Sequence, residues 1–125
     1  MATGLGKVIR DRAVQLRDAL SGGGIPTSLE AAQVQLPGAW VTFVSATPET
    51  MSGYRLRFHV YLIAPETGSS LATMDTLGEL LPKALDVIEP DEDITAMAVT
   101  LPTAPATPMP AMRLVVDELA DINED

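Results

Sequence analysis

The segment from Tyr54 to Ala64 alternates strictly between two kinds of side chain, and it constrains the fold more than any other stretch. One set is mostly apolar: Tyr54, Leu56, Phe58, Val60, Leu62 and Ala64. The other set is mostly polar or aromatic: Arg55, Arg57, His59, Tyr61 and Ile63. Because successive side chains of a strand point to opposite faces of a sheet, this pattern predicts a long strand with one core face and one polar face.

A helix is predicted to follow this strand after a turn over residues 65–69. Ser69 or Ser70 can cap its first turn. Its apolar residues recur at steps of three and four, which indicates one continuous buried stripe: Leu71, Met74, Leu77, Gly78, Leu81, Leu85 and Ile88. Pro82 costs about 3 kcal/mol in a helix interior, so we expect a kink or two short helices joined there. Residues 89–93 predict a solvated acidic turn.

The same patterns predict the other elements of the chain. Residues 7–20 indicate a first helix, which ends at glycines 22–24. Strand patterns recur at residues 34–36 (a possible short strand), 39–46, 94–101 and 111–119, with an irregular connection over 25–30. We therefore expect a single domain over residues 1–125 of the α+β class. Its mainly antiparallel sheet of four to five strands would carry two helices packed on one face, with a frayed acidic tail at 120–125.

Two connections are long or stiff enough to reach a neighbouring molecule. Residues 47–53 are long for a tight hairpin, so this loop is expected to project. Residues 102–110 include four prolines, which predicts a stiff, extended arm, with a plain connector as the alternative. The candidate contact residues are Pro48, Glu49, Met51, Pro102, Pro105, Pro108, Met109 and Pro110.

Charge is distributed unevenly along the chain, whose formal net charge is −9. Residues 1–65 hold six basic and four acidic residues, whereas residues 66–125 hold two basic and thirteen acidic residues. Phosphate binding needs clustered Lys and Arg, so this distribution disfavours broad nucleic-acid affinity. It is compatible with attraction between opposite ends of two copies, and a solvated acidic tail on a mixed surface is the alternative.

No catalytic, cofactor or metal motif is recognisable in the chain. Cysteine is absent, and His59 in the middle of the predicted strand is the single histidine. A nucleophilic triad and a zinc site therefore lack their usual residues, and we expect no catalytic residue, no cofactor and no metal. The chain also lacks the apolar run of a signal peptide or membrane span, so we expect a soluble protein made in a cytoplasm, without a membrane partner.

Several segments together carry a family resemblance. They are the Pro37-Gly38-Ala39-Trp40-Val41 entry into a strand, the strand over 54–65, the helix over 70–88 with Leu80-Leu81-Pro82, and the Pro-rich loop before residues 112–116. In length, element order and texture, most of residues 5–119 resemble the tail terminator (tail completion, minor tail) proteins of long, non-contractile-tailed phages, particularly those infecting actinobacteria. Glycines 22–24 depart from that pattern.

The resemblance implies a virion protein without catalytic residues. Members of this family form a hexameric ring on the head-proximal end of the tail tube, stop tube growth and present the surface to which the head attaches. The implied partners are further copies of this chain, the tail tube protein below and the head–tail connector above. Genomic DNA would pass through the ring without specific binding. A connector or neck protein of similar size is one alternative, and a non-viral α+β module that binds a small molecule or peptide is another.

Two hypotheses follow for the surfaces of such a ring. Copies that each carry −9 would repel one another unless basic groups met acidic groups of the neighbour. We therefore place Arg55, Arg57, His59 and Tyr61 at a junction with another subunit or with the tube. Part of the acidic surplus would face the channel, where negative walls let DNA slide.

Overall fold

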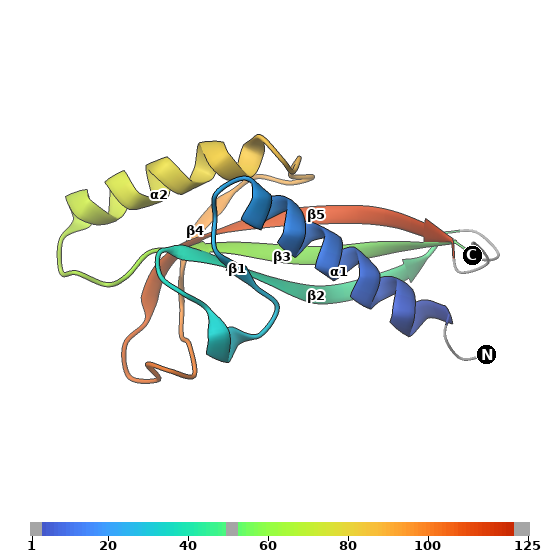
Figure 1. Cartoon of the computed structure of the whole chain (residues 1–125), viewed down its shortest axis with the longest axis horizontal. Coiled ribbons are helices and arrows are strands. Elements are labelled where there is room, and N and C mark those ends of the chain that lie inside the picture. The colour runs from blue at the N-terminus through green and yellow to red at the C-terminus, as the bar shows by residue number, and fades with distance from the viewer. Residues whose placement is uncertain (1–3, 50–52, 122–125) are drawn as a thin grey trace.

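Figure 1 shows the computed structural model of the chain, which describes residues 4–49 and 53–121. This part of the chain forms two α-helices and a five-stranded sheet, which confirms the α+β class. The elements are α1 (Gly4–Gly22), β1 (Thr27–Ser28), the 3₁₀ turn η1 (Ala31–Gln33), β2 (Gly38–Pro48), β3 (Gly53–Ile63), α2 (Ser70–Leu85), β4 (Thr95–Val99) and β5 (Met109–Asp121).

The sheet is mixed, with the strand order β1-β2-β3-β5-β4. The β2–β3, β3–β5 and β5–β4 pairs are antiparallel, as expected for most of the sheet, but β1 runs parallel to β2. The irregular connection predicted over 25–30 contains β1, and no strand forms at 34–36, where the chain leaves η1. A strand of two residues, Thr27 and Ser28, is too short to show alternation, which explains why the sequence pattern missed it.

The alternation predicted for β3 is confirmed. Leu56, Phe58, Val60 and Leu62 are completely buried. They belong to one core cluster with buried residues of both helices and of β5: Leu16, Leu20, Leu77, Leu80, Ala84, Leu114 and Val116. We call this side of β3 the core face and the side with Arg55, Arg57, His59 and Tyr61 the polar face. A smaller cluster of Ile63, Val99, Leu101 and Ala111 packs with Trp40 and Tyr61 at one end of the polar face.

Helix α1 ends at the glycines, as predicted, and is slightly longer at both ends than the predicted 7–20. Gly24 has a φ of +97°, a backbone conformation that favours glycine. The amide of Gly23 donates to the Ala19 carbonyl, and the amide of Ile25 donates to the Leu20 carbonyl at 3.0 Å. These bonds satisfy carbonyls of the last turn and direct the chain back into the core at Ile25.

Helix α2 is one helix that runs through Pro82, so the alternative of two short helices was wrong. Ser69 caps it, as predicted, by accepting a hydrogen bond from the Ala72 amide at 3.2 Å. The apolar stripe predicted for α2 is buried at Leu77 and, after the helix, at Ile88, while Leu85 is 43% exposed. Leu71 is 75% exposed and Met74 is 65% exposed, because the part of the helix before Leu77 lies outside the core cluster.

The two strands of the β2–β3 hairpin extend further than predicted. β2 continues to Pro48, β3 begins at Gly53, and the Glu49 amide donates to the Gly53 carbonyl at 3.0 Å. Thr47, Pro48 and Gly53 of the segment that was expected to project therefore belong to the paired strands. Met51 lies outside the described residues.

The proline-rich segment forms two consecutive turns, so the predicted extended conformation was wrong, while its role as a contact loop stays a prediction. The Ala104 amide donates to the Leu101 carbonyl, and the Thr107 amide donates to the Ala104 carbonyl. Pro102 and Pro105 each occupy the second position of one of these turns, where a fixed φ is favourable. Pro108 follows them.

The last strand is longer at both ends than predicted. Met109 and Pro110 belong to β5 and not to the proline-rich loop. At the other end β5 continues to Asp121 and buries Ala120, so the expected frayed tail cannot begin at residue 120. Residues 122–125 lie outside the described part of the chain.

Candidate functional site

The four residues that were predicted from the sequence to lie at an interface are found together on the polar face of β3: Arg55, Arg57, His59 and Tyr61. This strand is central, with β2 on one side and β5 on the other. In register, Arg57 lies beside Asp117 of β5, and Tyr61 lies between Trp40 of β2 and Arg113 of β5. All four side chains are partly exposed, so the polar face is available for contact along much of the strand.

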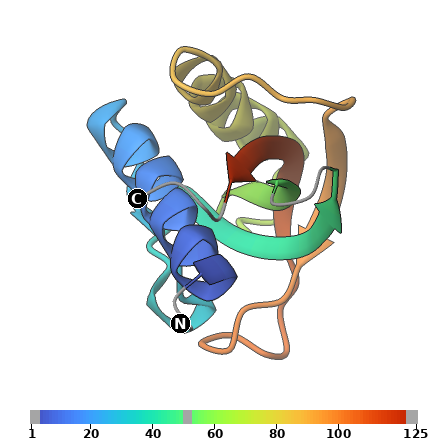
Figure 2. The ribbon, with the colours of Figure 1, turned by 90° about the vertical axis from the view of Figure 1, so that its right-hand side faces the viewer.

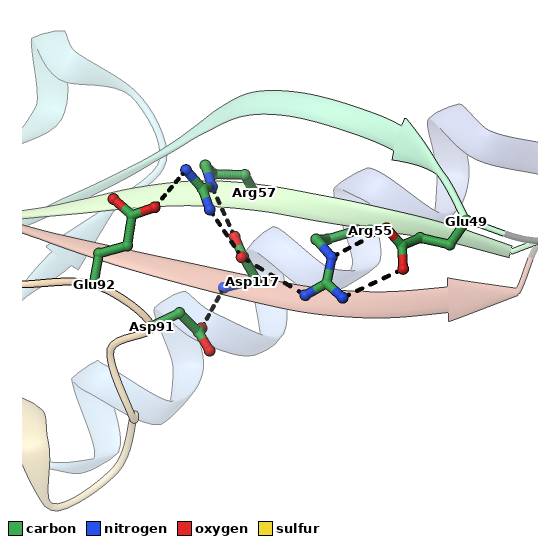
Figure 3. Close-up of polar contacts among 6 residues, drawn as sticks. All are labelled: Glu49, Arg55, Arg57, Asp91, Glu92 and Asp117. Atoms are coloured by element: carbon green, nitrogen blue, oxygen red, sulfur yellow. Dashed lines mark hydrogen bonds and ion pairs between the residues drawn. The ribbon is translucent and has the colours of Figure 1, made fainter.

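Arg57 is the centre of an ion-pair network (Figure 3). Its Nε and Nη2 donate to the two carboxylate oxygens of Asp117 at 2.9 and 3.0 Å, and its Nη1 lies 2.9 Å from Glu92. The Asp117 side chain is only 8% exposed, and its hydrogen bonds from Arg57 hold its pKa below the ordinary value. Charge reversal at Arg57 would therefore lower the stability of the fold as well as change the surface.

Arg55 is also paired within its own subunit. Its Nη2 and Nε lie 3.3 and 3.4 Å from the carboxylate of Glu49, and its Nη1 lies 3.8 Å from Asp117. Of the other candidate contact residues, Pro48 belongs to β2, while Pro102, Pro105 and Pro108 are exposed in the turns after Leu101. The two arginines therefore contribute a neutralised polar surface, not free positive charge.

The acidic turn after α2 has exposed acidic side chains, as predicted, and it is also anchored to the sheet. The Asp91 amide donates to the Val115 carbonyl at 2.8 Å, and the Asp91 carboxylate accepts from the Asp117 amide at 2.7 Å (Figure 3). Glu92 reaches Arg57 across the sheet. These partners are 26 and 35 residues away in the chain, so local sequence patterns could not indicate them.

Aromatic rings and one further cation occupy the end of the polar face toward Ile63. Tyr61 stacks on Trp40 with ring centroids 5.3 Å apart, and its hydroxyl lies 3.3 Å from Nδ1 of His59. Arg113, beside Tyr61 on β5, forms no ion pair or hydrogen bond through its side chain within the described residues, and its Nε is buried. The sequence reasoning missed Arg113, whose position on this face follows only from the β3–β5 register.

His59 should make stability depend on pH near neutrality. Burial lowers its pKa below the ordinary 6.5, and the positive charges of Arg113 and Arg57 lower it further, against the opposite effect of Glu92. The folded state then binds fewer protons than the unfolded state between the two pKa values. The free energy of unfolding should therefore decrease as the pH falls through about 6.5 toward the folded pKa.

Urea denaturation on both sides of that pH measures this effect. His59→Gln should remove the decrease in this range and leave the acid sensitivity of Asp117, which appears only at lower pH because it begins near the ordinary carboxyl pKa of 3.8 and continues to the lowered pKa of the folded state. An unchanged pH profile in the variant would contradict the role of His59.

Neither sequence comparison nor side-chain chemistry assigns this chain to a class of protein. No protein-family model matches the sequence, and no curated protein matches it significantly. Within residues 4–49 and 53–121, no three His, Cys, Asp or Glu side chains are grouped so that they could hold a metal ion. Neither of the helices described there has the length and apolar character needed to cross a bilayer. We therefore infer the function of the chain from its surfaces.

Proposed function

We propose that this chain is a structural virion protein. Six copies form a ring that caps the head-proximal end of a phage tail tube, stops tube polymerisation and provides the surface for head joining. The observation that supports this proposal is the separation of charge across the sheet. In the order β1-β2-β3-β5-β4, residues 1–65 supply α1 and the strands of one side, while residues 66–125 supply α2 and the strands of the other side.

The uneven charge of the sequence thus becomes a difference between two sides of the molecule. Helix α1 carries four basic and two acidic residues, whereas residues 70–93 carry seven acidic residues and one basic residue. Ion pairs neutralise most of the basic residues of α1, because Lys7 pairs with Asp11 at 2.8 Å, Arg12 with Glu118 of β5 at 3.3 Å and Arg17 with Asp18 at 3.1 Å. Asp75, Glu79 and Asp86 form no ion pair with the described residues. Sides of opposite sign favour head-to-tail contacts, which close into a ring when the rotation between copies permits it.

The proposal includes the arrangement of the two layers. Both helices would cover the core face. This arrangement is supported by the single core cluster, which contains Leu20 of α1, Leu80 of α2 and Phe58 of β3. The polar face would then be left for the neighbouring subunit or the tube. Since Arg55 and Arg57 are paired internally, Arg113 is the cation there that a carboxylate of a neighbour could neutralise.

The partners of this ring are the tail tube protein on one side and the connector on the other. Genomic DNA would pass through the channel without specific binding. The protein would be made in the host cytoplasm and reside in the virion. A neck or connector protein built from the same ring is the alternative that the experiment below must distinguish.

Native mass spectrometry and negative-stain electron microscopy of the purified chain test the proposal. We expect a closed ring of six copies that weakens as salt screens the attraction between its sides. Added to isolated tail tubes, the protein should bind at one end and prevent further growth. A chain that stays monomeric at high concentration and does not bind tubes would overturn the proposal. Binding to portal–neck complexes in place of tubes would favour the connector.

A further inference from the structure

A groove of about 600 Å³ lies between the N-terminal half of α2 and the neighbouring strands β4 and β5. Its lining is largely apolar and includes Met74, Leu77, Met97 and Met112. Met74 and Leu71, one turn earlier on α2, are the most exposed large apolar side chains on this helix. Single exposed apolar residues are common, but adjacent ones beside an apolar groove are typical of a contact surface, and methionines adapt readily to a partner.

The same side of the molecule ends in an open sheet edge. β4 is the last strand of the sheet and pairs only with β5 among the described residues. Residues 95–98, four of its five residues, are exposed. An open edge presents unpaired backbone groups to another chain, and natural proteins usually cover or interrupt such edges. Here the groove and the open edge adjoin, so one partner could cover both.

A complementary open edge lies on the other side of the sheet. β2 pairs with β1 only at Ala39 and Trp40, so the outer edge of residues 42–48 has no strand partner in the described part of the chain. Phe43 is 40% exposed, and Val44, at the irregularity between Phe43 and Ser45, is similarly exposed. In the end-on view of Figure 2, α1 lies at the left and the edge strand β4 at the right, and β2 curves below the centre from the one toward the other.

Charge complements the apolar contacts of the two sides. Glu66 lines the groove, and Asp75 and Glu79 lie on the helix that forms its wall. The opposite side carries the basic residues of α1. Lys7, Arg12 and Arg17 form ion pairs within the chain, whereas Arg10 is exposed and forms no ion pair within the described residues. Each copy thus has an apolar, acidic surface at one side and an apolar, basic surface at the other.

We propose that the groove between α2 and β4 receives the β2 edge of a second copy of this chain. Phe43 and Val44 of that copy would cover the apolar lining, and its α1 would face the acidic residues of α2. We call the two surfaces the acceptor groove and the donor edge. This inference rests on the proposed self-assembly and specifies its junction. The contact is heterologous, because each copy has one acceptor groove and one donor edge.

Two substitutions test the two surfaces of the junction one at a time. Met74→Asp disrupts the acceptor groove, and Val44→Asp disrupts the donor edge. Each should weaken association at least tenfold and give monomers by size-exclusion chromatography with light scattering, while thermal melts match those of the wild type because both side chains are exposed. Leu85→Asp is the matched control, since Leu85 at the end of α2 is as exposed as Val44 and lies outside both surfaces, and it should leave association unchanged.

Mixing the two variants gives the decisive result. Met74→Asp retains its donor edge and Val44→Asp retains its acceptor groove, so an equimolar mixture should form a heterodimer with one junction and nothing larger. A mixture that stays monomeric while the wild type assembles would overturn the inference, as would association of either variant alone at wild-type strength. In those cases self-assembly itself survives with a different junction. A wild type that neither self-associates nor binds tubes removes the proposed function together with this inference.

Discussion

Replacing Phe58 by alanine should lower the free energy of unfolding by about 3–5 kcal/mol. Phe58 is completely buried on the central strand and belongs to the cluster that joins the sheet to both helices. Removal of its ring deletes buried apolar surface and leaves a cavity that the neighbouring strands cannot close fully. Urea denaturation measures the loss, and an unchanged m value would show that the denatured state is unaffected.

Phe43→Ala is the matched control for this experiment. Phe43 lies directly opposite Phe58 in the β2–β3 register, and the two rings form an edge-to-face pair with centroids 5.7 Å apart. The two substitutions therefore remove the same ring contact, but Phe43 is 40% exposed and leaves no enclosed cavity. We expect a loss of about 1–2 kcal/mol. Equal losses at the two positions would show that Phe58 is not at the centre of the core.

Gly38→Ala should destabilise the fold by about 2–3 kcal/mol or more. A Cβ at this position would collide with the carbonyl oxygen of Gln35 and lie 2.7 Å from that of Pro26. Both obstacles are backbone atoms, so a change of rotamer cannot relieve them. The Pro26 carbonyl also accepts the Ala39 amide at 2.9 Å, next to the point where β1 joins the sheet. Faster hydrogen exchange of the Ala39 amide would therefore accompany the loss of stability.

Gly78→Ala should have the opposite effect and raise the free energy of unfolding. Gly78 lies inside α2, and a Cβ there would meet no atom within 4 Å. Alanine is a better helix former than glycine by about 0.5–1 kcal/mol, so Gly78→Ala should stabilise the protein by up to that amount. A neutral or favourable result at Gly38 would contradict the close approach of the chain before β2.

Local pattern was enough to predict the elements that depend on neighbouring residues. The alternation in β3, the β2–β3 hairpin, the glycine end of α1 and the Ser69 cap are all confirmed by the structure. Each of these features is decided by side chains within a few residues of one another. The parallel strand β1 was missed because its two residues gain their partners only through the approach of Gly38.

The candidate site depended on contacts that no local pattern contains. Arg57 was predicted to meet a partner outside the chain. The carboxylates that pair with it belong instead to Asp117 on the adjacent strand β5 and to Glu92 in the acidic turn after α2. The apolar stripe of α2 was read as continuous core, although periodicity reports only that residues share a face and not that something covers them. Met74 was predicted to be buried and is exposed, and this exposed side chain is the one that the Met74→Asp variant uses to test the junction.

The seam between β3 and β5 has a consequence for the electric dipole of the protein. Because the acidic half of the chain lies on one side of this seam and the more basic half on the other, a single subunit carries a dipole directed across its strands. In a closed head-to-tail ring these dipoles follow one another around the circumference, and by symmetry their in-plane sum is zero. A passing polyanion would then meet the net negative charge of the ring, because the acidic side of each neighbour would cover the basic side that attracts polyanions in a lone subunit.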